Sequence, residues 1–275
     1  MNSKTMTLKN VNTVPYLTYN SLEEINFIRH GFSTRLGGVS EGIFSSMNLA
    51  FNRGDDPDRV TENYKRLCSS IGLDYESLVA SAQDHHTFVR RVGKENVGVG
   101  IRKPRDMESV DALITNEKGV TLVTYYADCT PLFFVDIEKK AIGLAHAGWR
   151  GTVGRIGEKV IEKMTAEFGT NPEDLVCAVG PAISKCCYEV DKSCADEFYQ
   201  LEDLDNSKFI FPKENNKYMI DLLETNRQIL IKAGVRESNI TVSDLCTRCN
   251  SDLLWSHRAT NGQRGTMCAM MGIIG

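Results

Sequence analysis

AIGLAHAGWRGTVGRIGEKVIEKMTAEF, residues 141–168, joins a predicted strand to a predicted helix and shows the mixed character of the fold. Residues 141–145 are small and apolar, as in a buried strand. From Thr152 to Phe168 apolar residues recur every three or four positions, which predicts one amphipathic helix. His146 opens the turn between them, so its side chain is expected beside the N–H groups at the start of that helix, a natural place for an anion or a polar substrate.

Outside this segment, predicted strands and helices follow one another without a strict βαβ rhythm. There is no GxGxxG fingerprint and no phosphate-binding loop, so an α+β fold is favoured over a doubly wound sheet. No repeat or linker divides the chain, and we expect one domain over residues 1–275. The sequence predicts strands at 25–33, 78–82, 88–92, 120–126, 132–136, 176–179, 240–242 and 267–274, and helices at 58–71, 191–200 and 220–233.

The overall composition excludes some classes of partner. The chain has 275 residues, of which 41% are apolar and 25% charged, with a net charge of −4. A net negative charge does not favour binding to the negatively charged backbone of nucleic acid. The N-terminus is polar, and no apolar run approaches the roughly 18 residues needed to span a bilayer. We therefore expect a cytoplasmic protein that binds neither nucleic acid nor membrane, with its nine cysteines mostly as thiols.

Three side chains at predicted strand ends could share one site: His85, Cys129 and His146. Two imidazoles and a thiolate can hold zinc and leave the fourth position open to water, which is the mark of a catalytic zinc site. The same residues without metal could be a nucleophile–base pair, or simply a buried thiol with two hydrogen-bonded histidines. Asp128 beside the cysteine is a candidate proton carrier or a turn-stabilising residue. Spacing alone leaves these alternatives open.

Other motifs carry weaker signals. Arg35 lies in a glycine turn where a ligand could approach the backbone, and Arg150 follows His146 in its turn. Cys246 and Cys249 form a CxxC, but a structural zinc knuckle needs a second ligand pair. The only adjacent pair, Cys186–Cys187, is unspaced. We therefore predict that the CxxC is a turn with two ordinary thiols.

A set of motifs in fixed order resembles one known family. The motif HAGWRG at 146–151 is its centre, and the order of the set makes it far more specific than any single piece. The chain is similar over roughly residues 29–274 to the laccase-domain proteins, also named polyphenol oxidases or multifunctional zinc purine nucleoside phosphorylases. The matching pieces are HGFSTR (30–35) with Gly37 and Gly38, SMNL (46–49), Gln83-x-His85, DAL (111–113), ADCxP (127–131), HAGWRG, GPAI (180–183) and SHR (256–258).

This resemblance implies a layered α/β–β/α sandwich and a zinc enzyme. It implies phosphorolysis of adenosine, inosine, guanosine and methylthioadenosine, together with adenosine deamination, so the expected partners are a purine nucleoside and phosphate. His85 is preferred to His86 as the ligand because it keeps the Gln-x-His spacing. The implied zinc ligands are His85, Cys129 and His146, the catalytic residues are these three and Asp128, and the substrate- or phosphate-binding residues are Arg35, Asn48, Arg150 and Arg258.

Three alternatives accompany this interpretation. Copper-dependent phenol oxidation would suit the older family name, but five histidines are too few for a full multicopper set, although copper could still bind a Cys/His₂ site. An amide hydrolase acting in cell-wall precursor quality control would use Cys129 as nucleophile and His146 as base. A non-enzymatic interaction module would tolerate Cys129→Ala.

Overall fold

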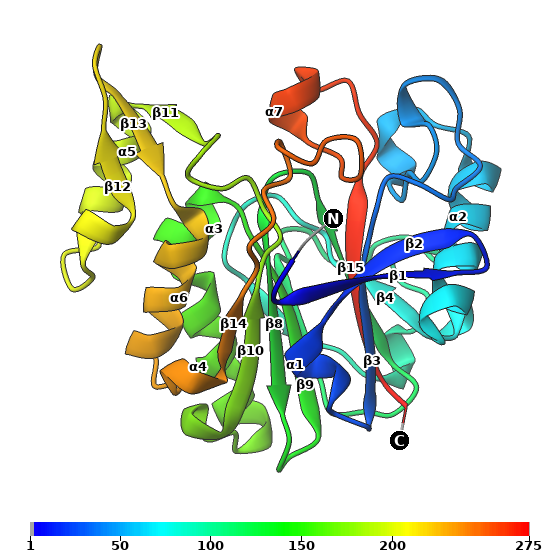
Figure 1. The fold of residues 1–275 in the computed structure, drawn as a ribbon. Helices are drawn as coiled ribbons and strands as arrows, with labels where there is room; N and C mark the ends of the chain where they lie inside the picture. Colours follow the sequence, from blue (N-terminus) through cyan, green and yellow to red (C-terminus); the bar gives the residue numbers. More distant parts are fainter. Residues whose placement is uncertain (1–2, 275) are drawn as a thin grey trace.

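Two six-stranded sheets stack face to face in the computed structural model, which describes residues 3–274 (Figure 1). The first sheet has the order β1 (Met6–Val11), β2 (Val14–Tyr19), β3 (Ile28–Ser33), β15 (Met267–Ile273), β7 (Thr121–Tyr126) and β4 (Leu78–Ala80). The second has the order β14 (Ile240–Val242), β10 (Leu175–Val179), β8 (Thr130–Asp136), β9 (Ala141–Ala147), β6 (Ala112–Thr115) and β5 (Val89–Arg91).

The alternation of side chains along each strand builds three apolar layers. Leu122 on β7 and Phe133 on β8 pack together in the core between the sheets. Their neighbours Val123 and Phe134 point the other way, into separate cores on the outer faces. Because successive strand side chains point to opposite faces, a strand that is apolar at every position must be covered on both sides.

Helices provide that cover. In Figure 1, α2 (Pro57–Ile71) lies outside the first sheet, whereas α4 (Ile156–Phe168) and α6 (Leu222–Lys232) lie outside the second. The start of α2 follows from its sequence, since Asp56 accepts a hydrogen bond from the Asp58 N–H and Pro57 occupies the first turn. The expected mixed fold, a sandwich layered helix, sheet, sheet, helix, is confirmed.

The helix predicted over residues 152–168 is wrong in its first turn. The structure has two helices, α3 (Trp149–Val153) and α4, separated by Gly154 and Arg155. Arg155 adopts a left-handed conformation with φ of 58°, which no α-helix can contain. The apolar periodicity is continuous across this break, so it hides the break from a pattern analysis.

Pro131 also differs from expectation. We expect a proline at this position to lie outside a central ladder, yet it lies in β8 between β9 and β10, opposite His146. It is the second residue of the strand, where the lost N–H donor affects only the end of the ladder. Its carbonyl still accepts a hydrogen bond from the Gly180 N–H at 2.9 Å.

Several elements were not foreseen. They include the β1–β2 hairpin, β6 and a three-stranded sheet that projects from one side of the sandwich (Figure 1). This small sheet has the order β11 (Glu189–Asp191), β13 (Lys217–Ile220), β12 (Ile210–Pro212), with α5 (Lys192–Tyr199) beside it. The remaining short helices are α1 (Asn20–Glu23) and α7 (His257–Thr260), with 3₁₀ turns at Gly42–Phe44, Phe51–Arg53, Tyr75–Ser77, Lys94–Asn96, Pro172–Asp174, Asn206–Lys208 and Glu237–Asn239.

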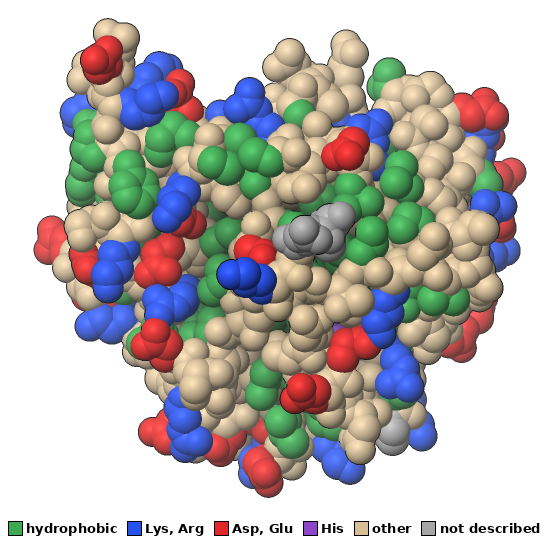
Figure 2. Space-filling model, viewed as in Figure 1, with side chains coloured by type: hydrophobic (Ala, Val, Ile, Leu, Met, Phe, Trp, Pro, Cys, Tyr) green, Lys and Arg blue, Asp and Glu red, His purple; other side chains and the backbone are tan. Residues whose placement is uncertain are grey.

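The surface carries both signs of charge. Figure 2 shows acidic and basic side chains interspersed over the face it presents, with no large field of one sign. Within residues 3–274, none of the helices has the length and apolar character needed to cross a bilayer.

Candidate active site and metal centre

His85, Cys129 and His146 meet at one end of the sandwich, with their ligand atoms all within 4.8 Å of one another. Each comes from a different part of the chain: His85 from the loop between β4 and β5, Cys129 from the turn between β7 and β8, and His146 from β9. The turn at Cys129 carries the chain from the first sheet to the second. The site therefore lies where the chain crosses between the sheets, which explains how residues so far apart in sequence come together.

The buried carboxylate of Asp111 organises this group. One oxygen lies 2.7 Å from His146 Nδ1 and also accepts the His85 N–H at 3.1 Å. The other accepts the N–H groups of Asp84 and His86, at 3.2 and 3.0 Å. Asp111 thus fixes both the His85 loop and the orientation of the His146 ring, leaving His146 Nε2 as the free ring nitrogen. No catalytic or binding role for Asp111 follows from spacing, although its place in the DAL motif before a buried strand was a usable signal.

In the protein without metal, the thiol and the imidazole perturb each other. Burial alone would raise the pKa of Cys129, but the neighbouring His146 and His85 lower it to about 6. Burial would lower the pKa of His146, but the Cys129 thiolate and Asp111 raise it to about 9. The pair therefore favours thiolate beside imidazolium near neutral pH.

The structure separates the two adjacent histidines. His85 lies in the group, with its ring centroid 4.9 Å from that of His146. The His86 side chain is 70% exposed, and its Nδ1 lies 2.8 Å from Asp84 Oδ1 and 2.9 Å from Ser109 Oγ. His30 is buried elsewhere, where it accepts the Tyr19 N–H, and burial lowers its pKa to about 4. His85 is thus the histidine that the Gln-x-His spacing selects.

Gly148 gives the group the room it needs. A Cβ atom at this position would lie 2.9 Å from His85 Cδ2 and 3.2 Å from Cys129 Sγ. Its φ of −67° is ordinary, so the requirement is for space and not for backbone freedom. This explains one glycine of the HAGWRG motif.

A pocket of about 730 Å³ opens beside the three side chains. Arg264 is prominent in it, because its Nε is buried without a hydrogen-bond partner and burial lowers its pKa to about 10. Arg53 and Arg105 also line the pocket, and neither could be found from the sequence because neither lies in a recognisable motif. The aromatic lining residues are Phe51, Tyr125, Tyr126, Trp149 and Tyr188, and the basic ones other than the two group histidines are Arg53, Arg105, His257, Arg258 and Arg264.

Two of the predicted functional residues outside the group line this pocket. Asp128 has a positive φ of 85°, and its carboxylate accepts hydrogen bonds from Thr247 Oγ1 at 2.5 Å and from the Arg258 N–H at 2.7 Å. These contacts match a turn-stabilising residue, and its catalytic role stays a prediction. Arg258 lines the pocket and donates to the Glu189 carbonyl at 3.0 Å.

Among the described residues, the other three predicted substrate- or phosphate-binding residues do not line the pocket. Arg35 stacks on Trp255 at 3.9 Å and donates to the Ser251 carbonyl. Asn48 is fully buried and accepts the Thr266 N–H. Arg150 is exposed and lies over its neighbour Trp149. Their predicted contact with substrate or phosphate stays a prediction.

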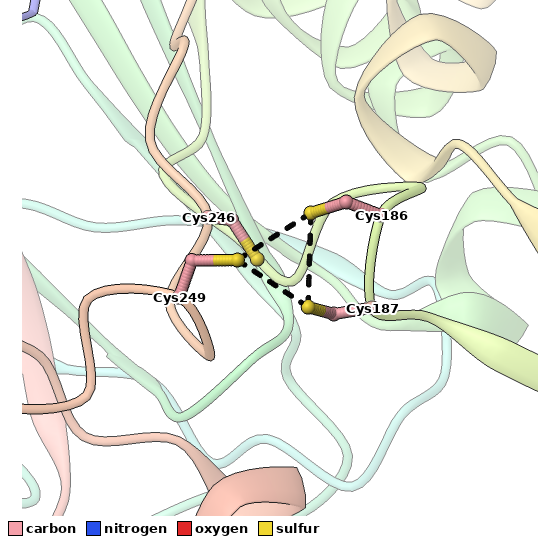
Figure 3. A group of neighbouring side chains, drawn as sticks. All are labelled: Cys186, Cys187, Cys246 and Cys249. Atoms are coloured by element: carbon pink, nitrogen blue, oxygen red, sulfur yellow. Dashed lines mark hydrogen bonds between the residues drawn. The ribbon is translucent and has the colours of Figure 1, made fainter.

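The expectation that the CxxC has no partner pair is wrong. The side chains of Cys246 and Cys249 meet those of Cys186 and Cys187, and all four sulfur atoms lie within 4.8 Å of one another (Figure 3). Adjacent cysteines are a poor pair in an extended chain, but a tight turn here presents both sulfurs to the same point.

The chain is similar to known proteins over most of its length. The family described as multi-copper polyphenol oxidoreductase laccase matches residues 29–274. The purine nucleoside phosphorylase YlmD of Bacillus subtilis (strain 168) is 37% identical over 246 residues, which cover 88% of this chain and 87% of that protein. The purine nucleoside phosphorylase LACC1 of Homo sapiens is 32% identical over 251 residues, 89% of this chain but 55% of that longer protein.

Solved structures show the same fold. YlmD from Geobacillus stearothermophilus superposes with a TM-score of 0.88 at 34% identity, covering 98% of this chain and 99% of that one. A hypothetical protein, YfiH of Bacillus licheniformis, superposes with a TM-score of 0.89 at 31% identity, covering 94% of this chain and 96% of that one.

Proposed function

The chain belongs to the multi-copper polyphenol oxidoreductase laccase family, and on this premise we propose that it is a purine nucleoside phosphorylase. Its relatives named purine nucleoside phosphorylase support an enzyme of that kind. The proposed substrates are adenosine, inosine, guanosine and methylthioadenosine. We further propose that the same pocket deaminates adenosine.

One observation carries the proposal: the His85, Cys129 and His146 group and a set of arginines share a single pocket. Arg264 Nε is a buried donor without a partner in the described protein, and a phosphate oxygen would satisfy it. Aromatic side chains on the same walls suit the flat face of a purine. A pocket of about 730 Å³ has room for a nucleoside with phosphate beside it.

In phosphorolysis a phosphate oxygen attacks the anomeric carbon of the ribose while the bond to the purine nitrogen breaks. The arginines would hold the phosphate in position beside the neutral nucleoside and lower the cost of taking the phosphate charge out of water. Burial, Arg264 and other nearby charges lower the pKa of His257 on balance, which favours its neutral imidazole, and the ring N–H could donate a hydrogen bond to the departing base.

The donor set fits a zinc ion. Two imidazole nitrogens and one thiolate within 4.8 Å of one another match a three-ligand site, and Asp111 holds His146 in the tautomer that presents Nε2. Bound there, zinc would supply a Lewis acid at its open position, which is most useful for deamination at the purine C6.

Phenol oxidation by a multicopper set has less support. Within residues 3–274, only His85 and His146 of the histidines belong to a group with metal-binding spacing. A trinuclear copper cluster needs many more imidazoles than this.

The test is incubation of pure, metal-quantified protein with inosine and phosphate, and separately with adenosine. We expect hypoxanthine and ribose 1-phosphate in equal amounts, dependent on phosphate, and inosine with ammonia from adenosine alone. If ribose 1-phosphate is absent under all conditions, the phosphorylase proposal is wrong. If adenosine with phosphate yields adenine, but adenosine yields no inosine with or without phosphate, only the deaminase part is wrong.

A further inference from the structure

We propose that Cys186, Cys187, Cys246 and Cys249 form a second, structural zinc site that ties together two loops of the pocket wall. All four thiols are free, and they come from segments some sixty residues apart in the chain. Figure 3 shows the side chains of both segments pointing toward one another.

The distances between the sulfur atoms suit a tetrahedral metal. Cys186 Sγ lies 3.7 Å from Cys187 Sγ and 3.6 Å from Cys249 Sγ. The distance between Cys187 Sγ and Cys249 Sγ is 3.4 Å. Four sulfurs at about 2.3 Å from zinc lie about 3.8 Å from one another, close to these values. The sulfur atoms of a disulfide are about 2.05 Å apart, well below these distances. A single disulfide would also leave two of the four clustered thiols without a partner.

Backbone hydrogen bonds shape both loops to present two sulfurs each. The N–H groups of Cys187 and Tyr188 donate to the Ser184 carbonyl at 2.9 and 3.0 Å, which makes a tight turn. The opposite loop closes when the Asn250 N–H donates to the Cys246 carbonyl at 3.1 Å. Two turns of this kind, each offering a pair of thiolates, are how small zinc-binding modules achieve four protein ligands.

The two loops are also joined directly. The Ser184 N–H donates to Cys246 Sγ at 3.4 Å, and the Thr247 N–H donates to the Ala182 carbonyl at 3.0 Å. A thiolate that accepts a backbone N–H is stabilised in its charged form. These contacts hold the sulfurs near one another before any metal binds.

The ligand count distinguishes this site from the His85, Cys129 and His146 group. Four protein ligands complete a tetrahedron and leave no position for water or substrate, so the site is structural. Zinc binding would release the four thiol protons and leave a net charge of −2 on the cluster. The exposed side chains of Lys185 and Arg248, each next to a ligand in sequence, supply nearby positive charge.

The four-cysteine cluster lies next to residues that line the pocket. Ile183 and Tyr188, on either side of the first cysteine pair, line the pocket. Thr247, between the second pair, donates to Asp128 beside Cys129. A zinc ion here would therefore fix one wall of the pocket relative to the candidate active site.

The test is the zinc content of tag-free protein purified under reducing conditions, measured by inductively coupled plasma mass spectrometry. We expect about two zinc ions per chain in the native protein and about one in Cys129→Ala/His146→Ala. Cys246→Ser/Cys249→Ser should also lose one equivalent. The matched control Cys194→Ser changes a half-buried cysteine outside both groups and should keep the full content.

A second measurement leaves all four cysteines of the cluster in place, so it does not depend on the folding of Cys246→Ser/Cys249→Ser. Cobalt(II) loaded into Cys129→Ala/His146→Ala should give the strong thiolate-to-metal absorption of a tetrahedral four-sulfur site. Hydrogen exchange at residues 183–188 and 246–250 should slow when zinc is added to metal-free protein. The proposal is overturned if this variant binds no zinc, if its cobalt spectrum lacks thiolate bands, if the purified site holds iron, or if reductant-free mass spectrometry finds the cluster as disulfides in freshly lysed cells.

Discussion

The two groups of possible metal ligands in this protein differ in the features that decide what a bound metal could do. One offers two imidazoles and a half-buried thiol, opens into a pocket, and is held by the buried carboxylate of Asp111. The other offers four thiols on two tight turns and has no carboxylate among its ligands. Three ligands leave chemistry possible, whereas four ligands leave only a cross-link.

Sulfur alone does not mark the reactive site in this protein. His146 and His85 lower the pKa of the Cys129 thiol, and the same two histidines are its partners in the proposed zinc site. The pKa of the Cys249 thiol is raised, chiefly by its hydrogen bond with Cys187, another thiol. The neighbours of each cysteine therefore decide its role, and changing those neighbours should break the difference between the groups.

The largest effect is expected from Cys129→Ala. This change removes one of three ligands and should lower kcat/KM for inosine by about 10²–10⁴-fold, because both metal binding and charge stabilisation are lost. The thermal midpoint should change little, since the pocket is open on this side. Steady-state kinetics and thermal unfolding measure the two quantities. Cys68→Ala, which alters a buried thiol on α2, is the matched control and should keep full activity.

Asp111→Asn should have the next largest effect. The amide cannot accept the His85-loop N–H groups and hold His146 Nδ1 as the carboxylate does, so zinc affinity or kcat/KM should fall about 10–100-fold. Competition with a chromophoric chelator measures the affinity. Asp136→Asn, at the far end of β8, changes another buried aspartate and should leave both values unchanged. Equal losses in both variants would mean that Asp111 only stabilises the fold.

Gly148→Ala should give a smaller loss. The added methyl group would lie within 2.9 Å of the His85 ring and displace it, which should reduce activity about tenfold while zinc at the four-thiol cluster is retained. The measurements are kcat/KM and zinc content on the same sample of the variant. An unchanged kcat/KM would show that His85 is not held in its place by this contact.

The smallest effect is a difference in thiol reactivity. In metal-free protein, Cys129 should be a thiolate above about pH 6, so its alkylation by iodoacetamide should rise through pH 6 and fall away below it, where the thiol is protonated. Cys249, with a raised pKa, should react mainly at higher pH. At pH 7 the advantage of Cys129 should be only about fivefold, because a less basic thiolate is also a weaker nucleophile. Peptide mass spectrometry measures both rates, and a Cys129 profile that rises only near pH 9 would contradict the ion pair.

The sequence predicted the parts of the fold and of the site that depend on local pattern or on ordered motifs. Strands such as β14 and helices such as α2 follow from apolar runs and caps, and the motifs around His85, Cys129 and His146 select the residues that the structure brings together. The break between α3 and α4 at Arg155 could not be predicted from the sequence, because the apolar periodicity continues through it.

What the sequence missed depends on three-dimensional contact. The role of Asp111 appears only when its carboxylate is seen to reach two separate segments. Arg53 and Arg105 reach the pocket from loops without a motif. The cluster of four thiols requires a tight turn at Cys186 and a bridge between Ala182 and Cys246, neither of which spacing reveals.

The contrast between an open and a closed zinc site is tested most directly by anomalous diffraction at the zinc edge from crystals of the native protein. We expect two peaks per chain. One should lie about 2.0–2.3 Å from the ligand atoms of His85, Cys129 and His146, with no fourth protein ligand. The other should lie about 2.3 Å from four cysteine sulfurs. A single peak, or a fourth protein side chain bound at the first site, would contradict this account.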